Sequence, residues 1–505
     1  MPDTPARASI ALDDERLKRV YPALVAAVVA GAAVFFTWTR SDMWLDEALS
    51  VNIARLPLGD LRAALERDGA PPLYYALLHV WTGAFGDGDL AARSLSSTFA
   101  FGALVATWFA ARRFGGSRMA WIAVVVTAAN PYMMRYATEA RMYVVEIALV
   151  ACGIVVVYRA LDRPAMGRLA LVGLVTALLV YTQYWAFYLV GVVGLVLVVT
   201  RRWPVVVAVG AGVLAFAPWL PTFLSQREHT GTPWGDPVLP GTPIGETFLG
   251  FSGGEEQEGW LLLLVLFPML VLGVFGRAVD ERRVELDLRA VPEIRWPAFV
   301  GAATLVGGLS LSYLAGQAFE PRYSAIVFPF FVLLVARGLM TLGDARVRVA
   351  LLALVVALGW LGGVRNVTEQ RTQAGQVAAA LHANARPGDL VVYCPDQLGP
   401  AVHRLGPAGL DEVTYPALES PVFVDWRDYE QRLRASDPNT FATEVHSRAG
   451  ERPLWYVSGP GYPTHMGACE AIAEALGRAR ERVFHVIPDE DFFEKPGLVE
   501  FRPRQ

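Results

Sequence analysis

The sequence predicts a polytopic α-helical membrane protein with about 11 transmembrane helices, followed by a C-terminal α/β domain. Three observations predict this class. The 505 residues are 54% hydrophobic and only 18% charged, whereas a soluble globular domain usually carries about 25% charge. Long apolar runs recur up to residue 364, and the chain beyond them is polar and mixed. We therefore assign residues 1–366 to a transmembrane domain and residues 367–505 to an α/β domain.

The first apolar run covers residues 20–38 and follows a short basic cluster. It is about 19 residues long, which suffices to span a bilayer. It lacks a small-residue cleavage site, so we interpret it as an uncleaved first helix. Ten further runs follow, at residues 90–110, 120–134, 142–161, 169–182, 185–200, 205–224, 260–276, 298–318, 324–342 and 349–364.

Residues 71–85 are also apolar, but at about 15 residues this stretch fits an interfacial or re-entrant helix better than a span. The arginines support that count. With eleven spans, alternate loops carry the basic clusters near residues 16–19, 112–118, 159–168, 201–202, 277–295 and 346–348, and the opposite loops carry far fewer. The positive-inside rule predicts a multi-pass protein of the cell membrane with a cytoplasmic N-terminus and an extracytoplasmic C-terminal domain.

The C-terminal part alternates candidate strands with helices. Residues 374–385 and 467–480 are predicted helices. The predicted strands are residues 389–394, 421–424, 453–458, 483–487 and 498–501. Such alternation predicts a small domain with a largely parallel sheet. No independent active site is recognisable in it.

Charge and cysteine content exclude several classes of function. The net charge of −4 provides no basic footprint for nucleic acid. The three cysteines form no CxxC pair, which excludes the usual zinc and dithiol motifs. Cys394 and Cys469 both fall in the polar C-terminal part, where they could pair if it is extracytoplasmic. The sequence leaves their pairing open because their separation in space is unknown.

The extracytoplasmic loops gather ionisable residues at the ends of the spans, where charge is expensive and usually functional. Asp46 and Glu47 follow the first span, Glu139 and Arg141 lie in the second loop, and Arg322 lies in the fifth. Arginine binds phosphate through a planar fork. An aspartate can accept the proton of an alcohol. The combination suits an in-line displacement of a phosphate at a sugar carbon.

Each group also has an ordinary structural interpretation. Asp46 and Glu47 could be solvated interface charges, and Glu139 could form a local ion pair with Arg141. Arg322 could snorkel at a helix end. The aromatic residues of these loops fit an interface belt. The case for a site rests on the coincidence of these groups at one membrane face.

Four segments carry a family resemblance. Residues 44–48 (WLDEA), 68–75 (DGAPPLYY), 136–143 (YATEARMY) and 320–323 (EPRY) resemble the glycosyltransferase 39 family. This is the protein-mannosyltransferase and aminoarabinose-transferase type of polytopic enzyme with the GT-C fold. The resemblance extends over roughly residues 20–345.

The resemblance implies an inverting glycosyltransferase that uses a polyprenyl-phosphate sugar on the extracytoplasmic side. The acceptor would be a hydroxyl of a cell-envelope glycan, lipid or protein. Asp46 would be the catalytic base, with Glu47 beside it as a second catalytic candidate. The donor-phosphate candidates are Arg141, Arg322, Tyr143 and Tyr323, and the substrate-binding candidates are Glu139, Tyr74, Tyr75, Gln183 and Tyr184.

Two departures from the family bear on metal use. Relatives often carry histidines where this chain has Ala70 and Gln183, and such histidines could support a divalent metal. We therefore predict that no metal or other cofactor is required.

Two other classes of function remain open. One is a lipid or glycan transporter or flippase without catalytic activity. Transporters usually show repeat symmetry and polar groups at mid-bilayer, and neither is evident in the sequence. The other is a non-enzymatic scaffold. The identity of the sugar and of the acceptor cannot be read from the sequence.

Overall fold

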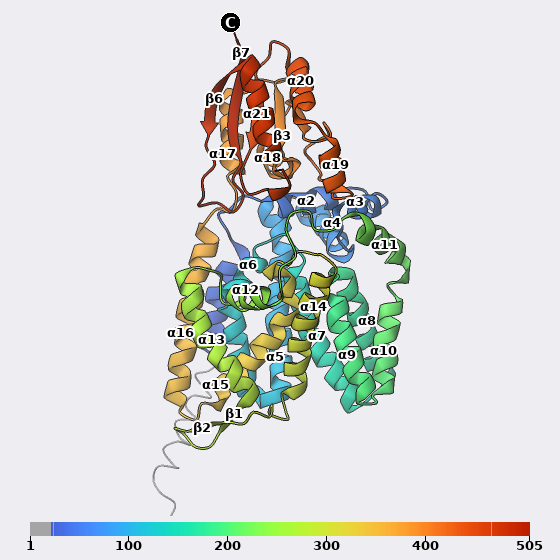
Figure 1. Cartoon of the computed structure of the whole chain (residues 1–505). Helices are drawn as coiled ribbons and strands as arrows, with labels where there is room; N and C mark the ends of the chain where they lie inside the picture. Colours follow the sequence, from blue (N-terminus) through green and yellow to red (C-terminus); the bar gives the residue numbers. More distant parts are fainter. Residues whose placement is uncertain (1–21, 24, 466, 505) are drawn as a thin grey trace, which may run out of the picture.

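The computed structural model describes residues 22–23, 25–465 and 467–504. A long helical bundle carries a smaller sheet domain at one end (Figure 1). Within the described residues, seven helices are long and apolar enough to cross a membrane, and three shorter helices are also apolar. This is the predicted polytopic architecture.

The predicted runs correspond to helical segments of the bundle. The first run lies partly outside the described residues, and its described part forms the helix Val25–Thr37. The others form α5 (Asp89–Ala128), α7 (Tyr143–Asp162), α8 (Met166–Thr182), α9 (Ala186–Val199), α10 (Trp203–Leu214), η1 (Ala217–Trp219), α11 (Leu220–His229), α13 (Gln257–Phe275), α14 (Arg295–Leu314), α15 (Phe328–Thr341) and α16 (Ala345–Thr368).

Glycines explain two features of the bundle. Gly115 and Gly116 have non-helical backbone angles inside α5. They separate the run predicted at residues 90–110 from the run predicted at 120–134, whose last residues lie beyond α5. Gly338 of α15 lies so close to the backbone of α13 that a Cβ atom would collide with the Met269 carbonyl oxygen. Small residues allow this close approach of membrane helices.

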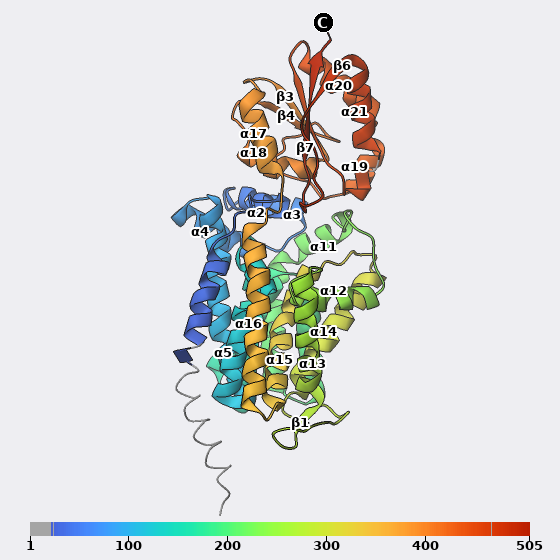
Figure 2. The same cartoon turned by 90° about the vertical axis from the view of Figure 1, so that its left-hand side faces the viewer.

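Short helices collect at the end of the bundle that bears the sheet domain. Here α2 (Leu45–Ala54), α3 (Leu61–Asp68) and α4 (Leu73–Phe85) lie directly beneath that domain (Figures 1 and 2). Helix α4 has 13 residues, too few to span a bilayer, as predicted for residues 71–85. The remaining short helices are α6 (Pro131–Ala137), α12 (Gly241–Phe251), which was not predicted, and η2 (Pro321–Val327).

The opposite end of the bundle carries a small hairpin. Strand β1 (Gly276–Ala278) pairs antiparallel with β2 (Val284–Leu286), in the loop that holds the largest predicted arginine cluster. Figure 1 shows this hairpin and the sheet domain at opposite ends of the bundle. The arginine-rich loop and the C-terminal domain are therefore separated by the length of the helices.

The C-terminal sheet has the strand order β4-β3-β5-β7-β6. The strands are β3 (Leu390–Cys394), β4 (Asp411–Thr414), β5 (Leu454–Ser458), β6 (Arg480–Val486) and β7 (Gly497–Pro503). Strands β4, β3 and β5 are parallel, whereas β7 runs antiparallel to both of its neighbours. The sheet is therefore mixed and less parallel than predicted.

One predicted strand was wrong. Residues 421–424 form no strand, because their apolar side chains serve a contact between domains. Val424 packs with Trp44 and Leu45, and the Val422 carbonyl accepts a 2.8 Å hydrogen bond from the Asn52 side chain. The sheet instead contains β4, which the sequence did not predict.

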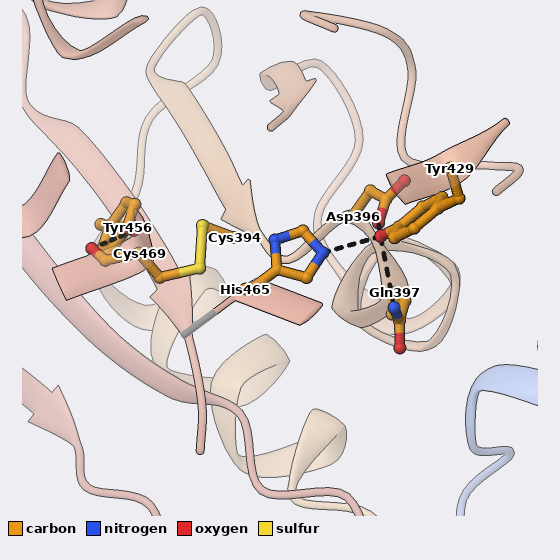
Figure 3. Close-up of a disulfide and its surroundings, with 7 residues drawn as sticks. All are labelled: Cys394, Asp396, Gln397, Tyr429, Tyr456, His465 and Cys469. Carbon is orange, nitrogen blue, oxygen red and sulfur yellow. Dashed lines mark hydrogen bonds between the residues drawn. A yellow bond between two sulfur atoms is a disulfide. The ribbon is translucent and has the colours of Figure 1, made fainter. Parts of the chain in front are cut away.

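Helices cover both faces of the sheet (Figure 2). They are α17 (Ala374–Asn384), α18 (Gly399–Leu405), α19 (Tyr429–Ala435), α20 (Pro438–Ala449) and α21 (Ala468–Ala479). A disulfide joins Cys394 of β3 to Cys469 of α21, with the Cα atoms 5.5 Å apart. Figure 3 shows it beside His465, whose Nε2 lies 2.8 Å from the Tyr429 hydroxyl. The pairing of these cysteines, which the sequence left open, is present in the structure.

Candidate active site

A cavity of about 1250 Å³ lies between the bundle and the C-terminal domain. Asp46, in the first turn of α2, contributes to its wall. Arg141 reaches it from the short loop between α6 and α7, and Arg322 from η2, whose first residue is a proline. Three segments far apart in the sequence thus place their charged residues in one cavity.

Two guanidinium groups flank the carboxylate of Asp46. Arg141 Nη2 lies 3.7 Å from Asp46 Oδ2, and Arg322 Nη2 lies 4.0 Å from the same oxygen. All three side chains are largely buried, with exposed fractions of 19% for Asp46, 13% for Arg141 and 17% for Arg322. Since both contacts are longer than hydrogen bonds, the carboxylate keeps free lone pairs toward the cavity.

Five buried donors in the cavity wall lack a hydrogen-bond partner among the described residues. They are Arg141 Nε, Arg322 Nε, the Tyr143 hydroxyl, Trp44 Nε1 and the Thr464 hydroxyl. A buried donor without a partner costs about 1–3 kcal/mol. The Arg322 guanidinium also lies 5.5 Å from the Trp44 ring and 5.8 Å from the Tyr323 ring. This wall is therefore suited to receive an anion.

Asp68 is a second cavity carboxylate, and it was not among the predicted site residues. It accepts a 2.7 Å hydrogen bond from the Tyr75 hydroxyl, which itself lies 3.4 Å from Arg141 Nη1. Burial raises the pKa of Asp68, and the nearby Arg141 charge opposes that shift. The signal was present in the sequence, since Asp68 opens the DGAPPLYY segment. Tyr75 itself does not line the cavity and instead connects Asp68 to Arg141.

Glu47 does not line the cavity, in contrast to its neighbour Asp46. Its carboxylate accepts two hydrogen bonds of 2.7 Å from Arg93 and one of 2.9 Å from the Ala140 N–H. Burial raises the pKa of Glu47, but Arg93, Arg371 and the Ala140 N–H together outweigh burial and hold the pKa below its usual value. Arg371 Nη1 lies 3.8 Å from Glu47 Oε2. Glu47 thus belongs to a buried ion-pair network that holds α2 in place.

Glu139 belongs to the same network. Its carboxylate accepts hydrogen bonds from Arg135 at 2.7 Å and from Arg371 at 3.1 Å. Its contact with Arg141 is through the backbone, since the Glu139 carbonyl accepts the Arg141 N–H at 2.8 Å. Glu139 therefore shapes the loop that carries Arg141 and lies outside the cavity wall.

The other predicted substrate residues divide between the wall and the core. Gln183 lines the cavity, and with its amide nitrogen turned toward Glu146 it donates a 2.8 Å hydrogen bond to that carboxylate. Tyr184 and Tyr323 also line the cavity, and the Tyr184 hydroxyl donates to Gln226. Tyr74 is fully buried, with its hydroxyl 3.4 Å from Ser96 Oγ.

The C-terminal domain supplies part of the wall that the sequence did not indicate. Its cavity residues include Gln397, Trp426, Tyr462, Glu494 and Lys495. Gln397 lies in the short helix η3 (Asp396–Leu398), and the other four lie between the main helices and strands, without a recognisable motif. Their place in the cavity wall can be recognised only from the structure, in which the C-terminal domain lies directly above α2 and α3 (Figure 1).

Potential metal ligands come together at one place in the described part of the chain, at Cys394, His465 and Cys469. Both thiols there are engaged in the disulfide. The residues around Asp46 do not form such a group among the described residues.

The architecture is that of a polytopic membrane protein with a sheet domain at one end, and the likeness to solved structures identifies its fold as GT-C. No family model and no curated protein sequence matches the chain. Among solved structures, the chain is similar to ArnT from Cupriavidus metallidurans. For the apo state the TM-score is 0.58 at 14% identity, with 98% of each chain covered. For the form bound to undecaprenyl phosphate it is 0.59 at 14% identity, covering 95% of this chain and 98% of that one.

This likeness over nearly the whole length confirms the predicted fold class. At 14% identity the likeness concerns the fold. Membership of the glycosyltransferase 39 family in particular stays a prediction from the sequence segments.

Proposed function

We propose that this protein is an inverting glycosyltransferase that moves a sugar from a polyprenyl-phosphate donor to an acceptor hydroxyl. The observation that carries the proposal is the cluster around Asp46, with two guanidinium groups within 4.0 Å and unpartnered donors beside them. The similar ArnT structure was determined with undecaprenyl phosphate bound. A proton acceptor and an anion site in one cavity are the two elements that this reaction needs.

The donor phosphate would lie against Arg141, Arg322 and Tyr143, with the Trp44 indole as a further hydrogen-bond donor. Each arginine can offer its Nε, which lacks a partner among the described residues, together with one terminal nitrogen. This is the paired geometry in which guanidinium groups bind phosphate oxygens. Phosphate binding would also draw the guanidinium groups toward the phosphate, and so release the carboxylate of Asp46.

The reaction follows from this arrangement. The acceptor oxygen attacks the anomeric carbon while Asp46 takes the hydroxyl proton. The bond between that carbon and the phosphate oxygen breaks, and its electron pair leaves with the polyprenyl phosphate. The arginines stabilise the negative charge that develops on this leaving group. A single in-line displacement inverts the anomeric centre, and the proposed reaction requires no metal.

The apolar side of the cavity suits a lipid-linked donor. Leu214 and Leu220, at the end of α10 and the start of α11, line it from one side, and Leu311 and Leu314 of α14 from the other. All four leucines are exposed, Leu214 by 73% and Leu314 by 78%. In a membrane these exposed leucines would face lipid, so a polyprenyl chain could enter the cavity between α10–α11 and α14.

The predicted residues outside the cavity receive supporting roles in this proposal. Glu47 and Glu139 would hold α2 and the Arg141 loop in position, and Tyr75 would orient Asp68. Tyr74 would pack beneath them. In the cell membrane the cavity would open on the extracytoplasmic side, as the arginine distribution predicts, where the acceptor is a cell-envelope glycan, lipid or protein.

The test is a transfer assay in proteoliposomes with a panel of labelled polyprenyl-phosphate sugars and a cell-envelope extract as acceptor. We expect one donor to yield product. Asp46→Asn should lower kcat about 10²–10⁴-fold, the usual contribution of a general base, with an unchanged unfolding temperature. The matched control is Asp60→Asn, an exposed aspartate outside the cavity, which should transfer at the wild-type rate.

Two results would contradict the proposal. Transfer by Asp46→Asn at the wild-type rate would remove Asp46 as the base. Translocation of labelled lipid without product for every donor of the panel would favour the transporter alternative.

A further inference from the structure

One loop of the C-terminal domain reaches the helix that carries the proposed base. Glu494 lies on the segment between β6 and β7, is 3% exposed and lines the cavity. Its Oε1 accepts a 3.2 Å hydrogen bond from the N–H of Leu45. These residues are 449 positions apart in the sequence, so the contact joins the two domains.

Leu45 is the first residue of α2, and its N–H has no partner within the helix. The first N–H groups of any helix need an outside acceptor. The residue before α2 is Trp44, whose side chain makes no capping hydrogen bond. Glu494 therefore supplies an acceptor that the local sequence lacks.

Asp46 follows Leu45 directly, in the same first turn. A cap on this turn restricts the backbone from which the Asp46 side chain extends. Because Arg141 and Arg322 contact that side chain from two other elements, a small rotation of the turn would change both distances. Positioning errors of about 1 Å can lower a rate about 100-fold.

Glu494 is itself held firmly. The Thr372 hydroxyl donates to its Oε2, its own N–H donates to the Arg371 carbonyl at 2.9 Å, and its carbonyl accepts the Gln373 N–H at 3.0 Å. The preceding residue, Phe493, packs edge-on against Trp44 with ring centroids 5.3 Å apart. The loop thus presents a fixed carboxylate to α2.

We infer that Glu494 is a positioning residue for the proposed base, and that the C-terminal domain is therefore an integral part of the active site. This rests on the proposed function for its catalytic consequence. The capping contact itself can be tested without any substrate. If Glu494 positions the base, the C-terminal domain is required for sugar transfer even if it makes no contribution to acceptor binding.

The experiment compares Glu494→Ala with Glu494→Gln in the full-length protein. Alanine removes the acceptor, whereas the glutamine carbonyl oxygen can still accept the Leu45 N–H. The first readout is hydrogen–deuterium exchange of the peptide covering residues 44–50. We expect exchange in Glu494→Ala to rise about 5- to 30-fold, the range of typical N-cap losses, and exchange in Glu494→Gln to stay near wild type.

The second readout is transfer with the donor found in the panel. Glu494→Ala should lower kcat about 10-fold or more, with the KM for the donor unchanged within about twofold, and Glu494→Gln should restore most of it. The control is Asp491→Ala, an exposed residue of the same loop, which should match wild type in both readouts. Should Glu494→Ala not fold, Thr372→Val removes the anchor of Glu494 and should raise exchange in the same peptide.

Unchanged exchange in Glu494→Ala, or an equal rise in the alanine and glutamine variants, would overturn the inference. Failure of the wild-type protein to transfer any sugar would instead contradict the proposed function. The two failures are distinguishable because the exchange measurement does not depend on sugar transfer.

Discussion

Asp46 and Glu47 are adjacent acids with opposite expected roles, and substituting each one separates them. Glu47→Gln keeps the shape of the side chain but removes its charge, and turns an amide group toward Arg93. The side chain of Arg93 is 6% exposed and that of Glu47 is 0% exposed. The substitution therefore leaves a buried guanidinium without its counter-ion.

The structure sets the magnitude of this effect. Breaking a buried ion pair by neutralising one partner costs about 3–5 kcal/mol. For a protein of 505 residues, at about 2 cal/mol/K of unfolding entropy per residue, this lowers the unfolding temperature by about 3–5 °C. Asp46→Asn should change it by no more than about 2 °C, because the Asp46 contacts of 3.7 and 4.0 Å are loose and its side chain is partly exposed.

The assay is thermal unfolding of both purified variants in the same detergent, followed by intrinsic fluorescence and by size-exclusion chromatography after heating. Wild-type stability in Glu47→Gln would refute the assignment of Glu47 to a supporting network. An equal loss in Asp46→Asn would refute the separation of the two carboxylates.

Three further predictions concern the disulfide, the anion site and pH. Replacing Cys394 and Cys469 by serine should destabilise the C-terminal domain by about 4 kcal/mol, because the disulfide closes a loop of 75 residues. If the double-serine variant and the wild-type protein unfold at the same temperature in the absence of reductant, this prediction is wrong. Tyr143→Phe should weaken undecaprenyl phosphate binding about 5-fold and Arg322→Gln at least about 10-fold, and titration calorimetry that finds unchanged affinities would exclude the anion site. Burial raises the pKa of Glu494 from 4.5 to about 7. Protonated Glu494 therefore stabilises the folded protein fully below about pH 4.5, and this stabilisation is lost as the pH rises through about 7. The glutamine of Glu494→Gln cannot ionise, so the unfolding temperature of this variant relative to wild type should be higher at about pH 8 than at about pH 5. An equal difference in unfolding temperature at both pH values would show that Glu494 does not titrate in this range.

Much of the bundle could be predicted from apolar run length, because only the spans need long apolar segments. Helix α4 was recognised as too short to span by the same rule. Helix α12 was missed because its 11 residues lie in an irregular loop with several glycines and prolines. Strand β4 was missed because it begins with two acidic residues, Asp411 and Glu412. Only its last two residues are buried, so the sequence shows no apolar pattern typical of a strand.

The site could be predicted where charge at a span end indicated it. Asp46, Arg141 and Arg322 come together because their loops share one end of the bundle. The direction of a side chain within α2 was not predictable, so Glu47 was grouped with Asp46 although it points into a buried network. Glu494 was missed because a contact over 449 positions leaves no local pattern.

In the proposed donor complex, the phosphate lies between Arg141 and Arg322, beside Asp46. An experimental structure of this protein with undecaprenyl phosphate would test this placement. We predict phosphate oxygens within about 2.7–3.2 Å of both Arg Nε atoms and the Tyr143 hydroxyl. A phosphate bound elsewhere, with these donors still unpartnered, would contradict it.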